Sequence, residues 1–96
     1  MRGKVIDRTT GEPLIGAGVT ITFLDSKGGV TGATTNINGE YMVLFKEEDA
    51  RRRFEAKAGY IGYYSLITED SVIGDRHQVI TFPLQACSEI TYPEWP

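Results

Sequence analysis

Apolar and polar residues alternate along most of this chain with a period of two, whereas a period of 3.6 hardly occurs. Val19, Ile21 and Phe23, for example, alternate with Thr20 and Thr22. Such alternation is typical of a strand that buries one face. The same pattern predicts strands over residues 2–7, 19–23, 30–35, 40–45, 54–58, 63–68 and 78–84.

Short strands with turn signals about every eight to twelve residues predict an all-β fold, a seven-stranded β-sandwich with Greek-key connections. A length of 96 residues allows one such domain, over residues 1–84, followed by a tail or linker at 85–96. Two prolines in the last four residues oppose a terminal strand there. The inward phases predict a core of Val5, Val19, Ile21, Phe23, Tyr41, Val43, Phe54, Ile80 and Phe82.

The connections between strands carry their own signals. Asn38-Gly39 predicts a hairpin with a type I′ turn, which needs positive φ at both central residues. The strand that follows, 40–45, is apolar on both faces, which predicts a central position in a sheet. Residues 46–53 have acids first and bases last, which fits a short helix or a solvated loop equally well.

Residues 9–18, TTGEPLIGAG, hold three glycines and a proline and could be either a phosphate loop or a corner. A phosphate loop delivers its anion to a helix N-terminus, but these glycines lead into a strand. We therefore expect a corner in which Pro13 presets φ and in which Asp7 or Thr10 accepts the exposed N–H groups of the turn.

Composition excludes several classes of function. Ten basic against thirteen acidic residues, a net charge of −3, oppose a nucleic-acid partner. One cysteine excludes an internal disulfide, and with one histidine it leaves little for transition-metal chemistry. No apolar run is long enough for a membrane helix. With no apolar leader before the first strand, we expect a cytoplasmic protein or a segment of a longer one.

Three stretches occur in a characteristic order: GKVIDRTTGEPLIGAGVTI, TTNINGEY and AGYIGY. Together they resemble the carboxypeptidase regulatory-like domain, a transthyretin-like β-sandwich, over about residues 1–84. The matched positions are Gly3, Val5 and Asp7 in its first strand, Thr10, Gly11, Pro13, Leu14, Gly16 and Ala17 in its first corner, Thr35, Gly39 and Tyr41 in its hairpin, and Tyr60, Gly62 and Tyr63 in its GY element.

The resemblance implies framework roles for all of these residues and a module without catalytic activity. Such modules lie beside metallocarboxypeptidase domains or at the N-terminus of TonB-dependent transporters of the SusC type. The three stretches of this sequence are most similar to the transporter version found in Bacteroidetes. That version implies a periplasmic or cell-envelope location and neighbouring domains of a larger polypeptide, or a periplasmic protein, as partners.

Aromatic residues supply the candidate ligand site. Tyr64 and Trp95 are expected to be exposed, where they could contact an oligosaccharide or peptide, whereas Tyr60 and Tyr63 are expected to fill the core edge with their hydroxyls at the rim. Cys87 reads as an incidental free thiol.

No catalytic residue, metal or cofactor is predicted. The oxygens of residues 34–40 include one carboxylate, Glu40, which is a poor set for Ca²⁺. His77 has no second histidine to complete a triad or the site of a hydroxyisourate hydrolase. An isopeptide between Lys4 and a partner, assisted by Glu55, is disfavoured because Lys4 is out of phase with the buried Val5.

Overall fold

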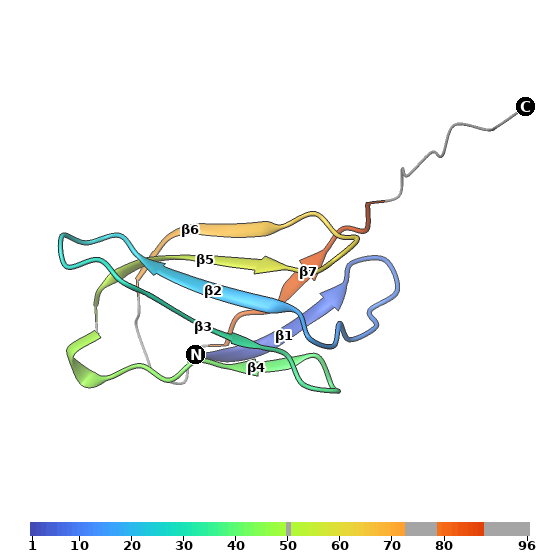
Figure 1. The fold of residues 1–96 in the computed structure, drawn as a ribbon, viewed down its shortest axis with the longest axis horizontal. Coiled ribbons are helices and arrows are strands. Elements are labelled where there is room, and N and C mark those ends of the chain that lie inside the picture. The colour runs from blue at the N-terminus through green and yellow to red at the C-terminus, as the bar shows by residue number, and fades with distance from the viewer. Residues whose placement is uncertain (50, 73–78, 88–96) are drawn as a thin grey trace, which may run out of the picture.

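The computed structural model describes residues 1–49, 51–72 and 79–87, and these residues form an all-β sandwich of two sheets (Figure 1). The small sheet has the order β4-β1-β7, with β4 at Glu40–Met42, β1 at Arg2–Asp7 and β7 at Phe82–Leu84. The large sheet has the order β3-β2-β5-β6, with β3 at Val30–Thr34, β2 at Gly18–Phe23, β5 at Arg53–Gly59 and β6 at Leu66–Val72. The sandwich predicted from the alternation is confirmed.

The large sheet is a regular antiparallel ladder. β2 pairs with β3 on one side and β5 on the other, so that Ile21 lies between Thr31 and Ala56. Successive side chains alternate between the core and the outer face, as the period of two requires. On its outer face Thr20 and Lys57 are direct neighbours on β2 and β5, whereas the flanking strands expose Val30 and Ile67.

The small sheet is shorter and mixed. β1 runs antiparallel to β4 and parallel to β7, so the first and last strands of the domain lie side by side. One further residue extends this pairing outside the regular strands, because Val79 forms an isolated parallel bridge with Arg2 of β1. Pairing between the two ends of the domain makes this sheet a long-range structure that no local pattern encodes.

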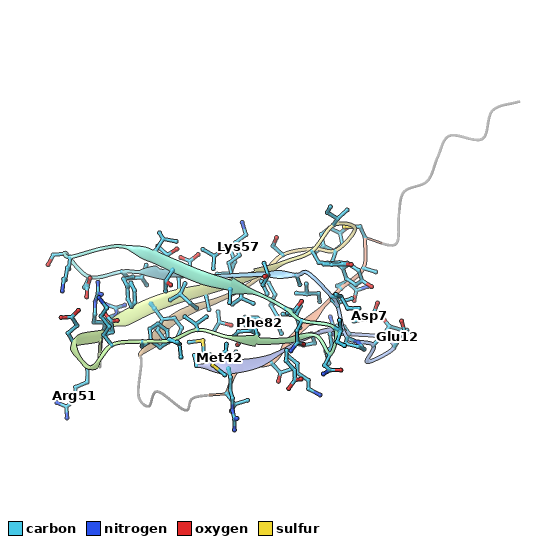
Figure 2. All side chains as sticks on the ribbon, turned by 60° about the horizontal axis from the view of Figure 1, so that its bottom comes forward. Asp7, Glu12, Met42, Arg51, Lys57 and Phe82 are labelled. Atoms are coloured by element: carbon cyan, nitrogen blue, oxygen red, sulfur yellow. The ribbon has the colours of Figure 1, made fainter. Side chains whose placement is uncertain are left out.

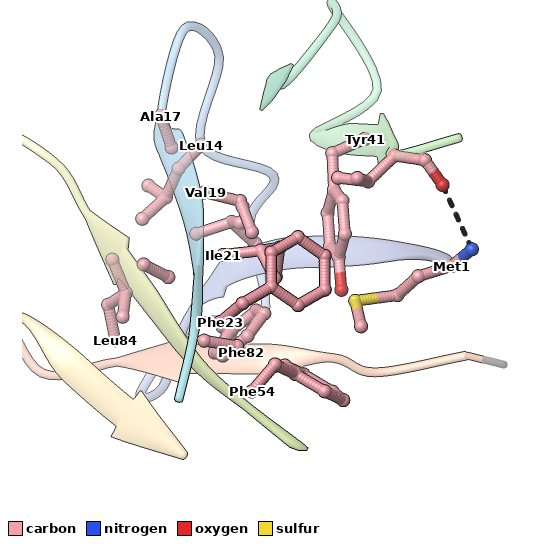
Figure 3. Close-up of a cluster of buried hydrophobic side chains, with 14 residues drawn as sticks. Met1, Leu14, Ala17, Val19, Ile21, Phe23, Tyr41, Phe54, Phe82 and Leu84 are labelled. Carbon is pink, nitrogen blue, oxygen red and sulfur yellow. Dashed lines mark hydrogen bonds between the residues drawn. The ribbon is translucent and has the colours of Figure 1, made fainter. Parts of the chain in front are cut away.

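The core between the sheets contains most of the predicted residues (Figure 3). Val5, Val19, Ile21, Phe23, Tyr41, Val43, Phe54 and Phe82 are buried, and Ile80 is half-buried against them. The structure adds Met1, Leu14, Ala17, Ala56, Ala58 and Leu84. The two alanines, Ala56 and Ala58, share the buried face of β5 with Phe54.

The predicted turn type at Asn38-Gly39 is wrong. Gly39 has φ of +71° but Asn38 has no positive φ. The Gly39 N–H donates to the carbonyl of Asn36, and the side-chain oxygen of Asn36 accepts the N–H groups of Asn38 and Glu40 at 2.9 and 3.0 Å. The carboxamide therefore selects a turn that begins at Asn36, and the chain passes from one sheet to the other instead of forming a flat hairpin.

The predicted central position of strand 40–45 is also wrong. β4 ends at Met42 and lies at the edge of the small sheet, with Met42 and Leu44 exposed. Its second apolar face therefore meets solvent rather than a neighbouring layer. β6 begins three residues later than expected. Residue 78, the expected start of the last strand, lies outside the described residues. The segment 46–53 contains a short 3₁₀ turn at Glu47–Asp49.

Candidate functional site

Four connecting segments meet at one end of the sandwich, which we call the corner end: residues 8–17, 35–39, 60–65 and 85–87 (Figure 1). Asp7 organises the first of them. Its Oδ1 accepts the N–H groups of Thr9 and Thr10 at 2.7 and 3.0 Å, and the Thr10 hydroxyl accepts the N–H of Glu12 at 3.2 Å. The corner predicted for TTGEPLIGAG, with Asp7 and Thr10 as acceptors, is confirmed.

Asp7 also links this corner to the loop after β5. The Tyr63 hydroxyl donates to Asp7 Oδ2 at 2.6 Å, and the ring of Tyr60 packs edge-on against Tyr63 at 5.7 Å. This bond is the largest cause of a lowered pKa of Asp7, and the bonds from Thr10 and Thr9 lower it further. The bond to Asp7 also raises the pKa of Tyr63. Tyr60 and Tyr63 are half-buried against the core, as expected. They bind neighbouring residues rather than presenting a free aromatic face.

Tyr64 is the predicted contact residue that the structure describes, and it is 58% exposed. Its N–H donates to the carbonyl of Gln85 at 2.8 Å, and the N–H of Cys87 donates to that of Gly62 at 2.8 Å. A fixed backbone therefore presents Tyr64 to solvent, beside Ile61, which is 95% exposed. Trp95 lies outside the described residues, so its exposure and its contact with a ligand or partner stay predictions.

The opposite end of the sandwich, which we call the arginine end, is built around one guanidinium. Arg52 donates to Asp25 at 2.6 and 2.8 Å, to Asp49 at 2.8 Å and to the carbonyl of Gly28 at 2.7 Å. The guanidinium also lies 3.8 Å above the centre of the Phe23 ring. These contacts are structural, since the N–H groups of Arg52 donate to residues of the protein itself.

The small sheet is anchored internally by a close approach that sequence reasoning missed. The Tyr41 hydroxyl donates to the carbonyl of Ile80 at 2.6 Å, and burial raises the pKa of Tyr41. A side chain at Gly3 would place its Cβ 1.7 Å from the same carbonyl oxygen. Glycine at position 3 is therefore required for the Ile80 carbonyl to turn inward to Tyr41.

Outside this anchor lies an open hollow of about 580 Å³ that extends from the end of β3 across β4 and β1 to Val79 and Thr81. Register places Arg2 beside Met42 and Val79, and Lys4 beside Glu40. Figure 2 shows Met42 on the side of the molecule away from Lys57, with Phe82 between them. The outward phase of β1 was visible in the sequence, but the strands that flank it were not.

The remaining candidates take part in no reactive cluster. Among the described residues, no group of three or more His, Cys, Asp or Glu side chains could hold a metal ion. Thr35 and Asn36, which could have offered oxygens to Ca²⁺, bond to backbone groups instead. Lys4 and Glu55 lie on the outer faces of different sheets, so Glu55 is not beside Lys4 to assist an isopeptide bond. Cys87 is a half-buried free thiol, and His77 lies outside the described residues.

Neither protein-family models nor curated proteins supply a relative from which a site could be transferred. No protein-family model matches the chain, and no curated protein matches it. Within the described segments, no helix has the length and apolar character needed to cross a membrane.

Proposed function

We propose that this domain is a non-catalytic accessory module of a larger exported protein, with a transthyretin-like Greek-key sandwich as its fold. In the leading version it is the periplasmic N-terminal domain of a TonB-dependent outer-membrane nutrient transporter. The proposal rests on the resemblance of its three sequence stretches to the carboxypeptidase regulatory-like domain and on what those stretches do in the structure.

One observation carries the proposal: the three stretches converge at the corner end, although they span about sixty positions of sequence. Tyr63 bonds to Asp7, Thr35 bonds to the backbone of Leu14 and Ala17, and the Gly39 carbonyl accepts the N–H of Val5. Each polar atom named here contacts the domain itself. Residues that resemble a family motif because they maintain the framework should have such contacts, whereas residues selected for a reaction should face a substrate.

The order of the strands supports the fold named in the proposal. β2 and β3 pair in the large sheet, and the chain then returns so that β4 lies beside β1 in the small sheet. A fourth strand that returns to the first is the defining feature of a Greek key, here divided between two facing sheets.

Fractionation of the source cells tests the location and the larger context together. An antibody raised against the purified domain should detect a polypeptide much longer than 96 residues in the outer-membrane fraction, and adsorption with the domain should remove the signal. A 96-residue species, or a long species in the cytosol, would overturn the proposal.

A second candidate, a carbohydrate-binding module, is favoured by the exposed ring of Tyr64 on its fixed backbone. Chemical-shift titration with mixed plant and bacterial oligosaccharides should then perturb residues 61–65. A titration in which these amides do not move, while the protein remains folded, would remove this candidate.

A further inference from the structure

The hollow on the outer face of the small sheet has two basic side chains at its centre. Arg2 and Lys4 both point outward from β1, the middle strand of that sheet. Within the described part of the chain neither of them forms an ion pair, although Glu40 is the cross-strand neighbour of Lys4. Arg2, Lys4 and Glu40 of the hollow together carry two positive charges and one negative charge, a net positive charge in a protein whose net charge is −3.

Exposed apolar side chains flank these charges. Met42 lies beside Arg2 on one side and Val79 on the other, and they are 62% and 60% exposed. Methionine adapts its shape to apolar partners and is common at peptide-binding surfaces. The hollow thus offers a cationic centre between two aliphatic walls.

We propose that this hollow binds an extended segment of a partner protein in which a carboxylate side chain has an aliphatic side chain two positions away on each side, so that all three share one face. The carboxylate lies between Arg2 and Lys4, and the aliphatic groups pack on Met42 and Val79. From β4 across β1 to Val79 and Thr81 the hollow crosses two strand spacings, about 10 Å, which corresponds to about three residues of extended chain.

Two further observations favour a peptide over a sugar or a small carboxylate. The aromatic residue that lines the hollow, Tyr41, is buried and its hydroxyl is bonded to Ile80, so no ring face is offered for sugar stacking. β4 pairs with β1 through odd-numbered residues, because Val43 N–H donates to Met1 and Val5 N–H to Gly39. The backbone N–H and carbonyl of Met42 therefore point away from β1 at the free edge of the sheet, where one end of a segment that crosses the face can form a hydrogen bond.

This inference does not depend on the compartment or the larger protein proposed above. It concerns a surface that is present in the isolated domain, so fractionation and binding can fail separately.

The test is a titration of the ¹⁵N-labelled domain with the capped peptide Ac-Val-Thr-Glu-Thr-Val-NH₂, in which the carboxylate and both valines share one face of an extended chain. The glutamine analogue Ac-Val-Thr-Gln-Thr-Val-NH₂ and free glutarate serve as comparison ligands. We expect saturable shifts at the amides of Lys4, Met42 and Thr81, with weaker binding of both comparison ligands. The double variant R2Q/K4Q should weaken binding roughly fivefold or more, whereas R8Q/K57Q, which removes the same charge from other exposed sites, should not.

Several results would overturn the proposal. One is equal binding of the glutamine peptide, which would remove the role of charge. Another is equal binding of glutarate, which would make the hollow a site for small carboxylates. Absence of binding, equal effects of the two double variants, or shifts confined to residues 61–65 would also overturn it, as would a concentration-dependent self-association through Met42 detected by sedimentation.

Discussion

The two ends of the sandwich are closed by different chemistry. At the corner end, neutral oxygens and one carboxylate accept N–H groups of the backbone, mostly within four residues of themselves. At the arginine end, one guanidinium joins Asp25 and Gly28, which lie 27 and 24 positions away in sequence. Figure 2 shows this separation, with Asp7 and Glu12 at one end and Arg51 at the other.

The two ends should differ in how much stability is lost when a hydrogen-bonding side chain is removed. The corner end includes Thr35, a buried side chain whose partners would have no access to water if its hydroxyl were removed. At the arginine end the side chain of Asp25 is 32% exposed and can be hydrated again when its partner is lost. We therefore expect the corner end to be the more sensitive one.

The largest effect should come from Gly39→Ala at the corner end. Gly39 has φ of +71°, and a Cβ there would lie 2.7 Å from Pro13 Cβ and 2.9 Å from the Val5 carbonyl oxygen. Strain and the clash together should lower the free energy of unfolding by about 3–5 kcal/mol in urea denaturation.

Gly62→Ala is the matched control for this substitution. Gly62 has φ of +86° but open space around it, so only the backbone strain, about 1–2 kcal/mol, should remain. If the two variants lost equal stability, the tight contact between the turn at Gly39 and the corner at Pro13 would be refuted.

The next largest effect should come from Thr35→Val, which keeps the shape of the side chain. The Thr35 hydroxyl accepts the N–H of Ala17 at 2.9 Å and donates to the carbonyl of Leu14. Leaving both backbone groups buried without a partner should cost about 2–4 kcal/mol. Thr35→Ser keeps the hydroxyl and should retain most of the stability, and a valine variant more stable than the serine variant would contradict this account.

The same contrast explains what the sequence could and could not predict. The corner was predictable because its acceptors lie within three residues of their donors, so that Asp7, Thr10 and Pro13 mark the turn locally. The alternation likewise predicted the inward residues of β1, β2 and β5, since burial on one face imposes a period of two.

Features that depend on distant residues were not predictable. Residues 46–53 fitted a helix or a loop equally well. Arg52 of this segment bonds to Asp25, and nothing within 46–53 identifies that distant partner. The hollow required knowledge that β4 and β7 flank β1, since Arg2 and Lys4 alone look like ordinary exposed charges. The apolar residues on both faces of 40–45 also predicted a central strand, whereas β4 lies at the edge of the small sheet with Met42 and Leu44 exposed.

A smaller effect is expected from Arg52→Met at the arginine end. The substitution keeps most of the aliphatic stem but removes the guanidinium that lies over Phe23 and its bonds to Asp25, Asp49 and Gly28. The midpoint of thermal unfolding should fall by several degrees, because the carboxylates regain water. Arg52→Lys should recover little, since an ammonium cannot reproduce the fork of bonds. Full recovery by lysine, or an equal loss in the exposed-site control Arg8→Met, would mean that charge alone closes this end.

The smallest expected effect is the loss of stability at low pH, to which the two ends contribute separately. Folding lowers the pKa of Asp7, chiefly through the Tyr63 hydroxyl, and that of Asp25 from 3.8 to about 2 through Arg52. A carboxyl with a lowered pKa in the folded state stabilises the protein above its unfolded pKa, and this stability is lost as the pH falls through the folded value. The urea midpoint should therefore fall from about pH 5 to about pH 2.

Asp7→Asn and Asp25→Asn should each flatten this curve of urea midpoint against pH. Tyr63→Phe removes the leading cause of the Asp7 shift and should flatten it at the corner end alone, so that a further, additive flattening by Asp25→Asn in the Tyr63→Phe background is expected. If Asp25→Asn had no effect in that background, acid would act through the corner end only, and the two ends would not be the independent closures that their bonds imply.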